Sequence, residues 1–136
     1  MTARNDRFIT RRAVTAGAAL FASPGFAAMP SRDRDAEVAA AQTAILAGLN
    51  DRDAASVVGR MTNRPDLRDR HGLVNRILDD LQMEIAEAPR AGTGEIRKRL
   101  ARRIQGDFAA GRTVILDGWL LTQTEVRLCA LAALQA

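Results

Sequence analysis

The stretch from Gly111 to Leu134 constrains the fold of this chain most, because it concentrates the residues that need an ordered environment. It holds the only tryptophan, Trp119, and the only cysteine, Cys129. It also holds the only run with β-strand character, over residues 114–121. A single cysteine cannot form an intramolecular disulfide, so packing alone must stabilise the fold. The remaining segments are expected to pack around this stretch.

Two local signals in this stretch predict a pair of strands followed by a helix. Asp117-Gly118 is a turn dipeptide, so residues 113–121 are expected to form a short β-like segment or a small hairpin, and a hairpin would have to lie on the helices. Thr122 and Glu125 have the spacing of a capping box, which predicts the start of a last helix. Apolar residues surround this helix on nearly every side, as in a helix that is buried or docks on another subunit.

Apolar spacing predicts four further helices upstream of the hairpin. The clearest period begins at Pro65, and Gly111 is expected in the left-handed conformation that often ends a helix. The sequence therefore predicts a mainly α fold, a small bundle of four to five helices with a short β-like segment or hairpin near residues 113–121. The four predicted helices cover residues 35–49, 54–61, 65–87 and 95–110, and a turn-forming linker covers residues 88–94.

The apolar residues of the predicted helix over 95–110 form one stripe. Their spacing of four residues places them on one face, which is expected to pack on the core. The stripe consists of Ile96, Leu100, Ile104 and Phe108.

The first 28 residues have the three-part plan of a secretory signal. Thr10, Arg11 and Arg12 resemble the start of a twin-arginine signal, whose pattern is Ser/Thr-Arg-Arg-x-Phe-Leu-Lys. Residues 14–16 depart from that pattern, which leaves ordinary Sec export as an alternative. The weakly apolar run over residues 13–22 favours the twin-arginine (Tat) route. We expect a cleavable signal over residues 1–28, a single small helical domain over residues 29–136, and export to the periplasm by the Tat translocase.

The formal net charge of +4 says little about the mature domain. Four arginines within the first 12 residues supply most of it, and from Met29 onward 16 basic residues stand against 15 acidic ones. A nucleic-acid partner is therefore not expected. No segment approaches the roughly 20 apolar residues that a membrane-spanning helix needs, so no transmembrane span is expected in the mature chain.

Charged residues gather into two bands on neighbouring predicted helices. The favoured interpretation is that the bands pair with each other across a helical hairpin or remain solvated. The alternative is an anion-binding face formed by Arg97, Arg99, Arg102 and Arg103. The acidic band comprises Asp79, Asp80, Glu84 and Glu87, and the basic band comprises Arg97, Lys98, Arg99, Arg102 and Arg103.

Few residues qualify for chemistry. His71 is the only histidine, so a zinc or haem site built by this chain alone is not expected. A dyad of Cys129 and His71 would resemble a thiol enzyme, but Cys129 lies in an apolar helix, where cysteine usually acts as a small core residue. We assign no catalytic, cofactor-binding or metal-binding residue and expect no cofactor.

Trp119 allows two interpretations. It is either a core anchor that covers a thin helical stack, or a surface for a partner together with Leu120 and Leu121. Burial of its side chain distinguishes the two.

Residues 117–131 are similar to the tail of small exported proteobacterial proteins, a resemblance that implies no activity. Small subunits of periplasmic, membrane-associated flavin dehydrogenases offer an analogy, since they are small, largely helical and carry the twin-arginine signal for a catalytic partner. The leading hypothesis is an exported, non-catalytic accessory subunit that packs on a larger, cofactor-bearing periplasmic oxidoreductase. The alternative is an independent periplasmic binding module that uses the basic helix face for an anionic ligand or partner.

Overall fold

The computed structural model describes residues 31–135, so the twin-arginine motif at Thr10, Arg11 and Arg12 lies outside the described residues. The described chain is mainly helical with one small antiparallel hairpin, as predicted. Within this range no helix is both long and apolar enough to cross a bilayer. The elements are α1 (Ser31–Ala47), α2 (Arg52–Met61), the 3₁₀ turn η1 (Pro65–Leu67), α3 (Arg70–Asp80), α4 (Ala88–Ala109), β1 (Thr113–Leu116), β2 (Trp119–Thr122) and α5 (Gln123–Ala133).

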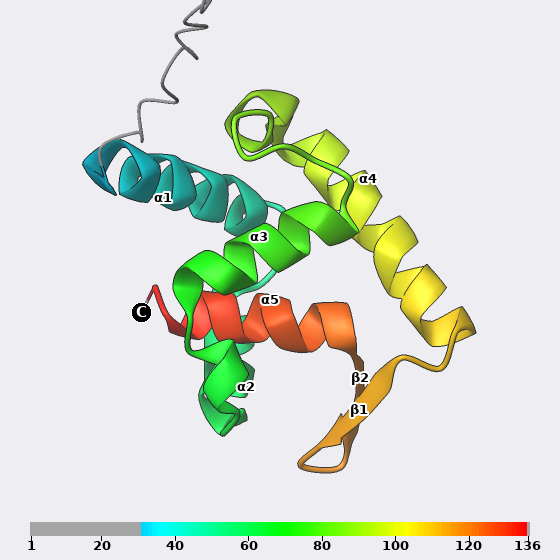
Figure 1. The fold of residues 1–136 in the computed structure, drawn as a ribbon. Coiled ribbons are helices and arrows are strands. Elements are labelled where there is room, and N and C mark those ends of the chain that lie inside the picture. The colour runs from blue at the N-terminus through cyan, green and yellow to red at the C-terminus, as the bar shows by residue number, and fades with distance from the viewer. Residues whose placement is uncertain (1–30, 136) are drawn as a thin grey trace, which may run out of the picture.

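The last helix, α5, is the centre of the fold. It packs most extensively on α2 and also contacts α1, α3, α4 and both strands. Figure 1 shows α3 between α1 and α5, with α2 and the hairpin on the far side of α5. The expectation of a last helix buried on several sides is therefore confirmed. Its buried residues are Thr124, Val126, Leu128, Ala130, Leu131 and Ala132.

Contact between α2 and α5 depends on a glycine that the sequence analysis did not single out. A Cβ atom at Gly59 would lie 1.9 Å from the backbone oxygen of Cys129 and 2.9 Å from the side chain of Ala133. Both distances are shorter than van der Waals contact, so only glycine allows the two helices to approach this closely. Gly59 thereby fixes the position of α2 against the central helix.

The predicted long helix over residues 65–87 is wrong. The chain forms η1, then α3, and α3 ends at Asp80. Gln82 has a positive φ of 53°, and the N–H of Met83 donates to the carbonyl of Leu78 at 3.0 Å. This arrangement is a left-handed helix end, here formed by a residue other than glycine. The apolar period of the sequence continues past the end of α3, because Leu81 and Met83 still pack in the core.

The predicted linker over residues 88–94 is also partly wrong. Helix α4 begins at Ala88, with Pro89 in its first turn, a position where proline is tolerated. The helix is interrupted at Gly92, whose φ of 75° and ψ of 155° are not helical. The break that the sequence suggested is therefore confined to one glycine, and the loop lies upstream at residues 81–87.

The apolar stripe of α4 does not reach its end. Ile96 and Leu100 are buried, but Phe108 is 47% exposed, and the neighbouring Asp107 is fully buried in its place. Asp107 points into the core because its carboxylate accepts hydrogen bonds from Thr124 of α5. The left-handed end at Gly111 is confirmed by its φ of 67°.

Candidate functional site

The hairpin connects α4 directly to α5 and follows the predicted turn chemistry. Asp117 and Gly118 both have positive φ, as a type I′ turn requires. The register pairs Leu116 with Trp119 next to the turn and Ile115 with Leu120 one step further. Side chains of successive pairs point to opposite faces, so the two faces of the hairpin carry different residues.

The base of the hairpin is held by a buried carboxylate. Asp107 accepts hydrogen bonds from the Thr124 hydroxyl at 2.6 Å, from the Thr124 N–H at 3.1 Å and from Arg112 Nε at 2.8 Å. Arg103 Nε lies 3.3 Å from the same carboxylate. Burial alone would raise the pKa of Asp107, but the hydrogen bonds from Thr124 and Arg112 outweigh it, and the pKa lies below its usual value. The charged form of Asp107 therefore joins α4, the start of β1 and α5.

The predicted capping box is confirmed at the junction of β2 and α5. The Thr122 hydroxyl accepts a hydrogen bond from the Glu125 N–H at 3.1 Å, and the Thr122 N–H donates to Glu125 Oε2 at 2.8 Å. Thr122 is fully buried and is also the last residue of β2. The strand thus passes into the central helix without a linker.

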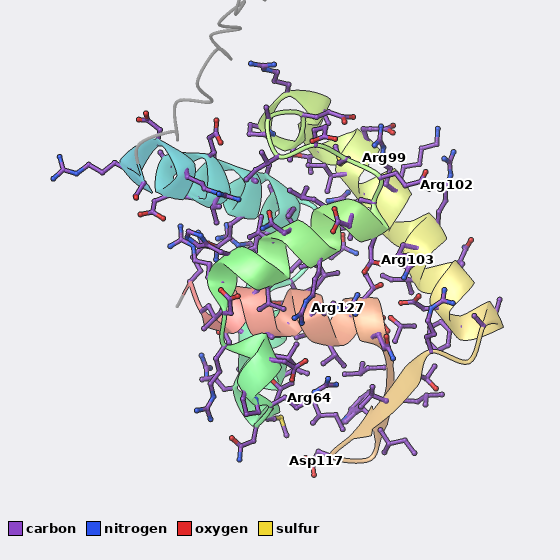
Figure 2. All side chains as sticks on the ribbon, viewed as in Figure 1. Arg64, Arg99, Arg102, Arg103, Asp117 and Arg127 are labelled. Atoms are coloured by element: carbon purple, nitrogen blue, oxygen red, sulfur yellow. The ribbon has the colours of Figure 1, made fainter. Side chains whose placement is uncertain are left out.

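The tip of the hairpin is apolar and exposed. Ile115 is 75%, Trp119 73% and Leu120 57% exposed, and we call these three residues the tip cluster, in which Trp119 lies on the opposite face of the hairpin from Ile115 and Leu120. The interpretation of Trp119 as a core anchor is therefore wrong. The hairpin lies on the helices only at its base, where Val114 and Leu121 pack against the core. Figure 2 shows Asp117 at the outermost point of the hairpin, away from the helices.

An apolar cleft separates the hairpin from α2. It has a volume of about 170 Å³. Trp119 and Leu121, two of the three predicted partner-surface residues, line this cleft, whereas the third, Leu120, belongs to a pair on the opposite face. The cleft is lined by Val58, Met61, Leu116, Trp119 and Leu121.

The predicted anion-binding face is largely engaged within the fold. Arg99 pairs with Glu95 at 2.8 Å and with Glu87 at 3.1 Å, and also donates to the carbonyl of Gln82 at 3.0 Å. It therefore closes the end of α3, as the paired-charge interpretation expects. Hydrogen bonding to Glu95 raises the pKa of Arg99 further above its usual value.

The other three arginines of this face divide between structure and solvent. Arg103 pairs with Asp80 at 2.8 Å, and the same carboxylate also pairs with Arg127 of α5. Arg97 and Arg102 are exposed, and no ion pair involving them occurs within residues 31–135. Figure 2 shows Arg99, Arg102 and Arg103 along α4, and Arg127 on α5. Arg97 Nε also donates to the carbonyl of Gly48 at 3.4 Å, so Arg102 is the one arginine of the predicted face without a hydrogen-bond or ion-pair partner within residues 31–135.

The cysteine and the histidine do not form a dyad. Burial, followed by the charge of Glu125, raises the pKa of the Cys129 thiol to about 11, which makes the thiolate scarce at neutral pH. His71 Nε2 lies 3.0 Å from Asp35 on α1 and is not hydrogen-bonded to Cys129 in the described part of the chain. No group of three or more metal-ligating side chains occurs among residues 31–135.

The hairpin therefore offers apolar side chains and backbone groups, which suit protein binding better than acid–base or nucleophilic chemistry. Comparisons with protein-family models, with curated proteins and with solved structures found no match.

Proposed function

We propose that this chain is a non-catalytic accessory subunit that binds a larger protein through its hairpin. The observation that carries the proposal is the tip cluster, three large apolar side chains held in water by a base of buried hydrogen bonds. Apolar residues that contribute nothing to the core of their own chain are typical of binding surfaces, where tryptophan is often a main contributor. The rigid base reduces the conformational entropy lost on binding.

The sequence supports a narrower identity for the partner. Thr10, Arg11 and Arg12 resemble a twin-arginine signal, which directs folded proteins across the membrane. Folded export commonly serves proteins that carry a cofactor, or small subunits that travel with such a protein. We therefore propose a cofactor-bearing oxidoreductase as the partner and the periplasm as the location, with the Tat translocase as the export machinery.

The alternative, an anion-binding module, has less support. Arg99 and Arg103 are already neutralised by carboxylates of the same chain, so a ligand would have to displace them. Arg97 and Arg102 alone would provide a weak, solvent-screened site.

The proposal is tested with the full chain, tagged at its C-terminus and produced in its own host from its own signal. We expect a complex of fixed stoichiometry with a larger subunit that shows flavin or haem absorbance, measured by size-exclusion chromatography with light scattering. Leu120→Asp is expected to reduce the recovered partner about tenfold or more, because it places a charge in an apolar contact. Leu134→Asp is the matched control, since Leu134 is an exposed leucine outside the hairpin.

Two outcomes would overturn parts of the proposal. A wild-type chain that elutes without a larger subunit, or equal recovery by the two variants, would remove the hairpin as a binding surface. A larger partner without a cofactor would leave the hairpin in place and remove the oxidoreductase.

A further inference from the structure

The hydrogen bonds at the base of the hairpin determine which backbone groups face outward. The Gln123 N–H donates to the Arg112 carbonyl at 3.0 Å, so these two residues form a hydrogen-bonded pair. Hydrogen-bonded and non-hydrogen-bonded pairs alternate along an antiparallel ladder. The Ile115–Leu120 pair is therefore of the second kind, and its N–H and C=O groups point away from the opposing strand.

The two edges of the hairpin are not equally open. On β2, the outward N–H of Thr122 already donates to Glu125, and α5 begins at the next residue. On β1, the outward N–H of Thr113 donates to the carbonyl of Gly111 at 2.9 Å, and the open outward groups belong to Ile115, which is 75% exposed. Leu120, the corresponding residue of β2, is 57% exposed and lies three residues before α5, so the edge of β1 is the more accessible of the two.

This edge lacks the devices that normally prevent strand pairing. Exposed edges usually carry lysine, proline or inward-pointing charges, and β1 has none of these in Thr-Val-Ile-Leu. A two-stranded hairpin is also marginal in water, whereas a third strand with an apolar face stabilises it. Both properties favour the addition of a strand from another chain.

The charge of the hairpin distinguishes a protein partner from a lipid surface. Asp117 is the only charged residue between Thr113 and Thr122, and within residues 31–135 it forms no ion pair. Membrane-binding surfaces carry lysine and arginine toward anionic lipids, and a carboxylate at the leading point opposes insertion. An exposed aspartate instead matches a basic residue on a protein segment.

We propose that β1 binds an extended segment of the partner as a third strand of the sheet. This inference rests on the proposed function, because it names the kind of segment that the hairpin binds. Alternate side chains of the segment are apolar, and a lysine or arginine at one end meets Asp117. The neighbouring cleft of about 170 Å³ accepts one apolar side chain, since a cavity of about 150 Å³ holds a benzene-sized group.

The first test uses ten-residue peptides, displayed on phage and selected on the immobilised full chain. We expect selected peptides with alternating apolar residues and a basic residue at one end. Amide hydrogen exchange at Ile115 should slow when a selected synthetic peptide is added, because its N–H becomes hydrogen-bonded. Failure to select a binder, or binding without a change at the Ile115 amide, overturns the inference.

The second test compares Ile115→Pro with Ile115→Ala. Both variants remove the isoleucine side chain, but only proline removes the outward N–H, and proline is tolerated where the N–H faces solvent. We expect the peptide to bind Ile115→Pro about tenfold more weakly than Ile115→Ala, because a main-chain hydrogen bond is lost. Equal affinity of the two variants, with equal melting temperatures, overturns strand addition.

The third test measures binding of the chain to vesicles of phosphatidylethanolamine and phosphatidylglycerol. Binding of the wild-type chain to these vesicles, lost in Leu120→Asp, would assign the tip cluster to a lipid surface and overturn the inference. The peptide and vesicle experiments do not depend on recovering the oxidoreductase, so failure of the proposed function and failure of strand addition are distinguishable.

Discussion

The base and the tip of the hairpin follow opposite rules although strands of only four residues connect them. At the base, polar groups are buried: Asp107, Thr122 and Thr124 are each fully enclosed and hydrogen-bonded. At the tip, apolar groups are exposed, and Trp119 is 73% accessible. Buried, hydrogen-bonded polar groups fix the direction of the hairpin, whereas exposed apolar area provides binding energy. The difference teaches that the base of the hairpin contributes to the stability of the chain, whereas the tip adds little to it.

The largest loss of stability is expected when the buried carboxylate at the base of the hairpin is removed. Asp107→Ala is expected to lower the free energy of unfolding by about 3 kcal/mol, because a buried charged partner is removed and others are left unsatisfied. Urea denaturation followed by circular dichroism measures the loss. Asp79→Ala, at an exposed carboxylate of α3, is the control and should change little. Equal effects of the two substitutions would show that the base is not specially held.

The close contact between α2 and α5 is tested at Gly59. Gly59→Ala is expected to cost about 2 kcal/mol, because the added methyl group meets the backbone of α5 and forces the helices apart. Gly106→Ala is the matched control in α4, where a Cβ meets no atom within 4 Å, and this variant should be at least as stable as wild type. Thermal melting distinguishes the two. A neutral Gly59→Ala would contradict the close approach of α2 and α5.

Lowering the pH is a reversible way to weaken the hydrogen bonds at the base of the hairpin. The pKa of Asp107 is lower in the folded chain than its usual value, so its contribution is present above about pH 4 and is lost as the pH falls through the folded pKa. We expect Asp107→Asn to be less stable than wild type at pH 6 and to lose less stability on acidification. Melting temperatures between pH 6 and pH 3 test this. Parallel curves would show that Asp107 does not titrate in this way.

The junction of strand and helix has a smaller expected effect. Thr122→Ala removes the hydroxyl that caps α5 and should cost about 1 kcal/mol. Thr93→Ala, at an exposed threonine, serves as the reference for loss of a hydroxyl alone. Denaturant midpoints of the two variants should differ, and coincident midpoints would argue against the cap.

The tip should show the smallest effect on stability. Ile115→Thr keeps a β-branched residue in the strand and should change the free energy of unfolding by less than about 0.5 kcal/mol. Val114→Thr, one residue earlier but packed against the core, should cost more. Equal losses in denaturation would mean that the two faces of β1 are equally supported, which would end the contrast.

Local chemistry could be predicted from the sequence. Asp117-Gly118 formed the turn, Thr122 and Glu125 formed the cap, and Gly111 ended α4, because each depends only on residues a few positions away. The predicted pairing of the two charged bands also holds for Arg99 and Glu87, although Glu87 caps α4 itself and does not lie on a neighbouring helix.

Long-range features could not be predicted in the same way. The burial of Asp107 depends on Thr124, 17 residues later, and the need for glycine at position 59 depends on the path of α5. The end of α3 was missed because Gln82, unlike glycine, does not mark a left-handed conformation in a sequence. The sequence left the exposure of Trp119 undecided, because only the direction of the hairpin decides which residues the core covers.

Thr122 ends β2 and caps α5, so no linker separates the hairpin from the central helix. A partner that binds the hairpin as proposed would therefore be attached to the central helix, and it would bind only molecules in which that helix is in place. By mass action, such binding raises the population of folded chain in proportion to the concentration of the partner. Chains whose core has not formed would then be left out of the proposed assembly.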